Sequence, residues 1–175
     1  RLWKVSRKEC FIFVGSFLGV LLLGTVNGVL IGIILSFSEV IIRNAKPARC
    51  FLGVQPGHTE FRDFRESSQI YAIEGVVIYR FSSNLFFANV KIFQSDIENS
   101  IKEDTKVVIV DAGGIGSIDI TAADRIEILY RSLKEKGIRF YMTEHIADLN
   151  EQLRNLGLGY LIEEGNVRRT ISVAL

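Results

Sequence analysis

One stretch of the sequence places chemically active side chains next to a glycine-rich turn. Residues 107–121 read VVIVDAGGIGSIDIT, in which an aliphatic run ends at Asp111 and three glycines precede Ser117, Asp119 and Thr121. The aliphatic run predicts a buried strand, and the polar residues suit the first turn of a helix. A strand, a tight turn and a helix N-terminus together form a common binding or regulatory site in α/β domains.

The three glycines reproduce only part of a dinucleotide-binding loop. Gly114-Ile-Gly116 supplies the first half of the GxGxxG pattern, but Asp119 stands where the third glycine belongs. No acidic residue ends a strand about 20 residues further on, where a ribose contact is needed. A Rossmann cofactor site is therefore disfavoured, and no cofactor is expected.

The polar residues at the end of this stretch also fit a purely structural interpretation. Thr121 and Asp124 have the spacing of a capping box, with Thr121 at the N-cap of a helix and Asp124 three residues later. Asp119 as the N-cap is a close variant of this prediction. Under either variant these side chains start a helix and need no chemical function.

The rest of the chain shows no assembled catalytic or metal-binding set. His58 and His145 are isolated from any Ser or Cys partner. Cys10 and Cys50 lack the neighbouring Cys or His residues of a zinc site. We therefore expect no catalytic residue, no metal and no enzyme activity. The near balance of 21 basic and 20 acidic residues argues against nucleic acid as a partner.

Residues 1–46 have the pattern of a membrane segment. No charged residue occurs between Glu9 and Glu39, a stretch longer than the roughly 20 residues that span a bilayer as a helix. Its centre, residues 24–28, contains two glycines and an asparagine and is its weakest helical part. Two transmembrane helices are therefore predicted, over about 11–23 and 26–42.

Glycines recur through this hydrophobic stretch at positions that helix packing uses. They stand at 15, 19, 24, 28 and 32, and most are four residues apart. This spacing lets helices approach closely in lipid, and we expect the partners to be membrane helices outside this chain.

Basic residues flank both ends of the hydrophobic stretch. They are Arg1, Lys4, Arg7, Lys8, Arg43, Lys46 and Arg49. By the positive-inside rule, both ends are expected on the cytoplasmic side of the inner (plasma) membrane, with lipid as a partner. Residues 47–66 contain both prolines and are predicted to be a linker, which leaves residues 67–175 as a cytoplasmic domain.

Strand and helix patterns alternate along residues 67–175. Strands are predicted over 70–81 with a bend at Gly75, over 106–111, over 138–142 and, as a short last strand, over 160–162. Helices are predicted over 90–101, 122–136 and 148–156, and the tail 167–175 is predicted to start one more. This order predicts the α/β class, with a mixed, mostly parallel sheet covered by helices.

The order of these segments resembles the C-terminal end of a sulfate permease (SulP) family anion transporter. The resemblance rests on the glycine-rich hairpin, on RNAKP (43–47), on LFFANV (85–90) and on VVIVDAGGIGSIDIT. It implies that residues 1–46 are the last two membrane segments of a longer transport core and that residues 67–175 are a STAS domain. It further implies that this domain regulates transport or docks partners, namely the core, another protein or a second copy of the chain.

The resemblance also names a candidate regulatory loop, formed by Asp111, Ser117, Asp119, Ile120 and Thr121. The STAS fold is shared with bacterial anti-sigma factor antagonists, which carry a phosphoacceptor serine directly after the aspartate at this junction. Ile120 occupies that position here and cannot be phosphorylated, so Thr121 is the neighbouring hydroxyl. A membrane-tethered phospho-switch at Thr121 is therefore the alternative function, and weak nucleotide binding near the loop is a further alternative that the family implies.

Overall fold

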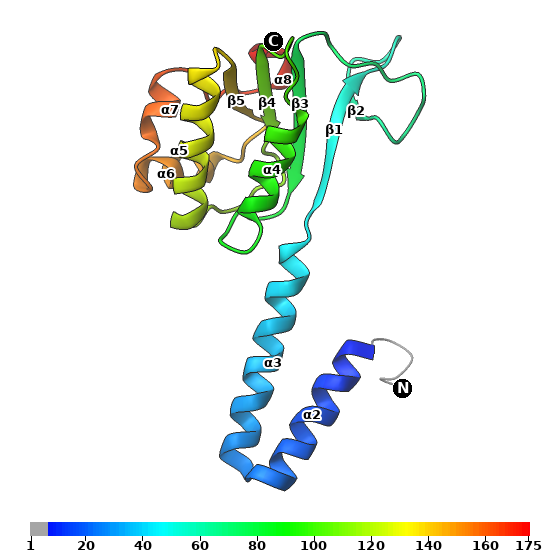
Figure 1. Cartoon of the computed structure of the whole chain (residues 1–175), viewed down its shortest axis with the longest axis vertical. Coiled ribbons are helices and arrows are strands. Elements are labelled where there is room, and N and C mark those ends of the chain that lie inside the picture. Colours follow the sequence, from blue (N-terminus) through cyan, green and yellow to red (C-terminus); the bar gives the residue numbers. More distant parts are fainter. Residues whose placement is uncertain (1–6) are drawn as a thin grey trace. The chain divides into compact units, whose positions relative to one another are not determined.

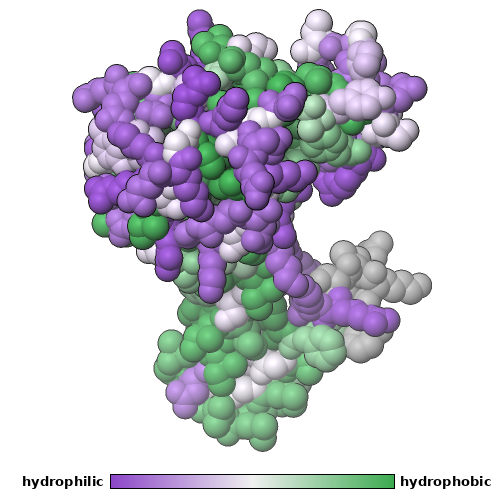
Figure 2. All heavy atoms as spheres, turned by 45° about the horizontal axis from the view of Figure 1, so that its top comes forward, coloured by the Kyte–Doolittle hydropathy of each residue, from purple (hydrophilic) through white to green (hydrophobic). Residues whose placement is uncertain are grey.

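The hydrophobic N-terminal stretch forms two helices, α2 (Arg7–Leu23) and α3 (Thr25–Ala45), in a computed structural model that describes residues 7–175 (Figure 1). Gly24 alone separates the two described helices, and its φ of 87° makes the predicted break. Among the described residues, α3 is the one helix long and apolar enough to cross a membrane, since α2 has 17 residues. The surface of the two helices is mostly hydrophobic (Figure 2).

The glycines of the two helices face each other within this chain. A Cβ on Gly28 would lie 2.6 Å from the backbone nitrogen of Val20, and one on Gly32 would lie 2.9 Å from the Ser16 hydroxyl oxygen. A Cβ on Gly19 would lie 3.5 Å from the Cα of Gly28. The expectation that these glycines pack against helices outside the chain is therefore wrong for these positions, because α2 and α3 use them to approach each other.

The second compact unit, Pro47–Leu175, contains a five-stranded sheet in the order β2-β1-β3-β4-β5. Its strands are β1 (Ala48–Val54), β2 (Phe61–Asp63), β3 (Val76–Ser82), β4 (Val107–Asp111) and β5 (Arg139–Thr143). β3, β4 and β5 are parallel, whereas β1 is antiparallel to both β2 and β3. Every described strand except β1 thus runs in one direction, which confirms the predicted mixed, mostly parallel sheet.

β1 and β2 correct the prediction that residues 47–66 are a linker. β1 pairs with β3 over five residue pairs, and only Lys46 and Pro47 lie between α3 and β1. The prolines and glycines of this region suggested a loop, but Gly53 lies inside β1. A Cβ at Gly53 would lie 2.6 Å from the carbonyl oxygen of Tyr71, so the backbone at Tyr71 requires a glycine at this position of the strand.

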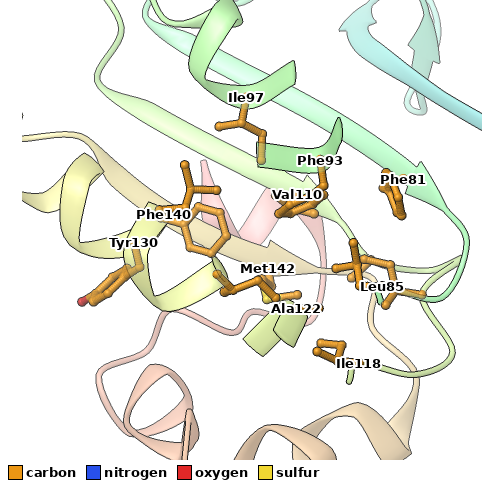
Figure 3. Packing of buried hydrophobic residues seen from close by; sticks show 14 of the residues in the cluster. Phe81, Leu85, Phe93, Ile97, Val110, Ile118, Ala122, Tyr130, Phe140 and Met142 are labelled. Atoms are coloured by element: carbon orange, nitrogen blue, oxygen red, sulfur yellow. The ribbon is translucent and has the colours of Figure 1, made fainter. Parts of the chain in front are cut away.

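Helices cover the two faces of the sheet unequally. The larger core packs four helices on one face: α4 (Val90–Ser100), α5 (Ile120–Glu135), α6 (Ala147–Asn155) and α7 (Gly159–Glu163). The other face is covered by the short α8 (Ile171–Ala174). Alternate residues of β4 pack into the two cores. Val108 and Val110 face the four helices, and Val107 and Ile109 face α8. Figure 3 shows part of the larger core.

Three local predictions differ in detail from the structure. Residues 160–162 belong to α7 and form no strand, since the Glu164 amide donates to the Tyr160 carbonyl at 2.8 Å and closes a helical turn. Three apolar residues are too few to separate a strand from a helical turn by periodicity. The strand predicted over 70–81 begins only at Val76, after the bend at Gly75. The predicted C-terminal helix is the four-residue α8.

Candidate regulatory site

The candidate regulatory loop starts at Asp111, at the carboxyl end of β4. The buried carboxylate of Asp111 accepts hydrogen bonds from Arg80 Nε at 2.9 Å and from the Gly113 amide at 3.0 Å. Burial opposes the charge of Arg80, but the hydrogen bond and the attraction of Asp111 outweigh it and raise the pKa of Arg80. Asp111 therefore joins β4 to β3 and to the start of the loop.

Two backbone amides at the glycine-rich turn donate hydrogen bonds to side chains of the same domain. The Gly116 amide donates to Asn84 Oδ1 at 3.1 Å, and the Ile118 amide donates to Gln152 Oε1 at 3.0 Å. Gln152 Nε2 in turn donates to the Gly116 carbonyl at 3.0 Å. A phosphate cradle needs free amides, so these bonds would have to break before the turn could hold a nucleotide phosphate.

A pocket of about 660 Å³ opens beside Asp111. Its charged lining consists of the carboxylates of Glu60, Asp111 and Glu144 and the guanidinium of Arg80. This excess of negative charge disfavours a phosphate ligand. Glu144 has a φ of 56°, which is rare for a residue other than glycine, and its Oε1 accepts from the Ile171 amide at 3.3 Å. Glu144 thus holds α8 against the pocket.

Asp119, and not Thr121, caps α5. The helix begins at Ile120, and Asp119 Oδ1 accepts from the Ala122 amide at 2.7 Å. The second oxygen, Oδ2, accepts from the Phe87 amide at 2.9 Å. The capping box with Thr121 at the N-cap is therefore wrong, and the close variant with Asp119 is correct. One carboxylate starts the helix and fixes the segment before α4.

The segments before α4 and α5 lie side by side. The Leu85 amide donates to the Ser117 carbonyl at 2.9 Å, and the Asp119 amide donates to the Leu85 carbonyl at 3.0 Å. Leu85 and Ile118 form a parallel bridge and point into the core (Figure 3). The loop therefore has a buried side made of aliphatic residues and a second side that faces solvent.

The solvent-facing side forms a surface that we call the rim, defined as Phe87, Ser117, Ile120 and Thr121. Phe87 is 60% exposed and Ile120 is 69% exposed. The sequence pointed to the other three residues but not to Phe87. The pattern that could have indicated Phe87 is the pair of adjacent phenylalanines in LFFANV. Thr121 is exposed as phosphorylation requires, but the carboxylates of the same turn would repel a phosphate there.

Asp119→Ala should lower the free energy of unfolding of a 47–175 fragment by about 2 kcal/mol. The variant loses the helix cap, which is worth about 1 kcal/mol, and leaves the Phe87 amide without its acceptor. Urea unfolding followed by circular dichroism measures this change. Asp124→Ala removes an exposed carboxylate from the same turn and should cost about 0.5 kcal/mol or less. Equal losses in the two variants would contradict the role of Asp119.

Residues 67–174 match the family model described as the STAS domain. The match covers more than half of the chain, so the chain belongs to the STAS domain family. It is also similar to proteins that carry transporter names. One, named "Probable sulfate transporter", from Mycobacterium tuberculosis, is 31% identical over 178 residues, which cover 100% of this chain and 32% of that protein.

A second relative and two solved structures extend this similarity. High affinity sulfate transporter 2 of Stylosanthes hamata is 23% identical, with 99% of this chain and 28% of that protein covered. The chain thus spans about a third of the length of these relatives. The murine Solute Carrier 26 family member A9 anion transporter in the inward-facing state has a TM-score of 0.83 at 22% identity over 99% of this chain and 29% of its own.

A crystal structure of a sulfate transporter family protein from Wolinella succinogenes has a TM-score of 0.53 at 24% identity, over 65% of this chain and 93% of that chain. At these identities, the two solved structures show a shared fold only. Together with the family match, they confirm the predicted STAS-like α/β fold and are consistent with the C-terminal part of a SulP transporter.

Proposed function

We infer that this chain is the C-terminal part of a secondary transporter for sulfate or a similar anion in the inner (plasma) membrane. Its similarity over the whole chain to proteins named sulfate transporters supports this proposal. The apolar helix α3 and the basic residues at both ends of the hydrophobic stretch support a membrane position with both ends in the cytoplasm. The STAS domain would then be cytoplasmic and would regulate transport.

One observation carries the regulatory part of the proposal, namely the short connection between α3 and β1. Lys46 and Pro47 alone separate the two described elements, and two extended residues reach at most about 7 Å. Pro47 further restricts the backbone of its own residue and of Lys46. A displacement of the membrane helix larger than this reach would have to move β1, a strand inside the sheet.

The chain enters the sheet at the edge that carries the candidate loop. Ala48 of β1 pairs with Ser82 at the carboxyl end of β3. Ser82 lies against the glycine-rich turn, since a Cβ on Gly114 would lie 2.7 Å from the Ser82 Cα. We therefore propose that the rim contacts the cytoplasmic side of the transport core. Such a contact regulates transport if it is stronger in one access state of the core than in the other.

Deletion of residues 47–175 from the complete transporter should change the rate of anion uptake several-fold at equal membrane abundance. The cut falls before Ala48 because β1 belongs to the sheet. Uptake of radiolabelled sulfate, divided by the amount of transporter in the membrane, measures the effect. Unchanged uptake at equal abundance would reject the regulatory function. Loss of the protein from the membrane would instead assign the domain a role in assembly.

A further inference from the structure

Three elements meet at one carboxylate oxygen close to the start of β1. Asp96 Oδ2 on α4 accepts a hydrogen bond from the Tyr79 hydroxyl of β3 at 2.6 Å. The same oxygen pairs with Nε of Arg49, the second residue of β1, at 2.5 Å. We call Arg49, Tyr79 and Asp96 the Asp96 cluster. It joins the entering strand, the sheet and the helix that follows the rim.

Packing alone does not require the polar groups of this cluster. The Tyr79 ring is fully buried, and its centroid lies 5.1 Å from that of Phe51 and 5.8 Å from that of Phe93. A phenylalanine could fill this space, whereas a buried hydroxyl is costly unless it is hydrogen-bonded. Burial, followed by the hydrogen bond to Asp96, raises the pKa of Tyr79, so its hydroxyl keeps its proton and remains a donor.

The ion pair of the cluster can open at low cost. The side chains of Arg49 and Asp96 are 39% and 23% exposed, so water can replace the guanidinium without leaving an unsolvated charge. The hydrogen bond from Tyr79 would still hold Asp96 in place. The cluster therefore has two accessible arrangements, one with β1 bound to α4 through Arg49 and one with Arg49 released.

The position of the cluster connects the membrane helix to the rim. Arg49 lies two residues beyond the Lys46-Pro47 connection, and its backbone is in register with Phe81 of β3. Asp96 lies on α4, which begins at Val90, three residues after Phe87 of the rim. A shift of β1 that keeps the ion pair closed must therefore pull on α4 and on the segment before it.

We propose that the Asp96 cluster transmits displacements of α3, through β1 and α4, to the rim. This inference rests on the proposed function, because it needs a transport core whose access states move α3. Arg49, Tyr79 and Asp96 are positioning residues in this scheme. The closed ion pair couples the rim to the membrane helix, and its opening uncouples them.

The test uses the complete transporter with Arg49→Gln, Tyr79→Phe and, as a matched control, Arg62→Gln. Arg62 forms an ion pair with Glu66 at 3.1 Å, and its side chain is 39% exposed, as is that of Arg49. We expect Arg49→Gln to change sulfate uptake per transporter by about threefold or more, within the range of known coupling effects. Arg62→Gln should leave uptake unchanged, and Arg49→Lys, which keeps the charge, should restore part of the wild-type rate. Melting temperatures of the purified variants show whether each one is folded.

Lengthening the Lys46-Pro47 connection distinguishes a coupling role of the Asp96 cluster from a merely structural one. Insertion of four Gly and Ser residues between Lys46 and Pro47 should change uptake as Arg49→Gln does, and the two changes combined should have no larger effect than either alone. If Arg49→Gln has the same effect with the native and the lengthened connection, the cluster does not act through α3 and the proposal is overturned. Unchanged uptake in both Arg49→Gln and Tyr79→Phe would also overturn it. If deletion of residues 47–175 leaves uptake per transporter unchanged, the proposed function itself fails.

Discussion

Gly114→Ala should lower the free energy of unfolding of a 47–175 fragment by about 3 kcal/mol. The new Cβ would lie 2.7 Å from the Cα and 3.0 Å from the Cβ of Ser82. Because the nearest atom belongs to the backbone of β3, no side-chain rotation can relieve the clash, and the turn must move away from the sheet. Overpacking of this kind costs about 1 to 3 kcal/mol, and a shift would also strain the hydrogen bonds of the turn.

Urea unfolding of the two glycine variants Gly114→Ala and Gly113→Ala provides the measurement and its matched control. A Cβ on Gly113 would lie 3.2 Å from Asp111 Oδ1 and 3.3 Å from the Glu144 carbonyl oxygen, a looser fit than the 2.7 Å approach at Gly114, so this variant should lose less, about 1 kcal/mol. A glycine kept for contact with a phosphate would be dispensable for folding. An unchanged unfolding midpoint in Gly114→Ala would therefore contradict the packing role and reopen a ligand role for the turn.

In the full-length transporter that we propose, Gly28→Ala should separate α2 from α3 and reduce the amount of folded protein in the membrane several-fold. The added Cβ would lie 2.6 Å from the backbone nitrogen and 2.7 Å from the Cα of Val20. Lipid supplies no hydrophobic force between helices, so close packing must hold this hairpin together, and a loss of about 2 kcal/mol or more is expected.

Membrane abundance and the melting temperature of the protein in detergent report this loss. Gly15→Ala is the matched control, because its Cβ would meet Leu35 Cδ1 at 3.5 Å, an ordinary contact. The control should retain the wild-type abundance and melting temperature. Similar losses in Gly15→Ala and Gly28→Ala would show that small residues matter throughout the helices and not at the contact with Val20.

Local patterns were sufficient to predict the elements that are buried along their whole length or on one face. All five residues of β4 are buried, and α5 buries the apolar positions that recur at helical spacing. Residues 47–66 were misassigned because Gly53 is required by Tyr71, which is distant in sequence. A glycine inside a strand looks like a loop residue until its neighbour is known.

The candidate site was predictable in its position but not in its bonding. The stretch 107–121 was sufficient to locate the loop, whereas the second bond of the helix cap Asp119, from the Phe87 amide 32 residues away, leaves no local pattern. The Asp96 cluster joins three separate segments, and no spacing along the chain reveals it. Long-range hydrogen bonds of this kind are settled by the tertiary fold, because the local sequence permits several partners.

Because β1 lies antiparallel between β2 and β3, it determines where this protein can be cut to give a folded fragment. The family match begins at residue 67, which lies after both β1 and β2. A fragment cut at that boundary would lose an interior strand and leave the backbone amides and carbonyls of β3 unpaired along its edge. Such an edge is a template for pairing with another chain, so the shorter fragment would aggregate, whereas a fragment that begins at Pro47 keeps the edge covered.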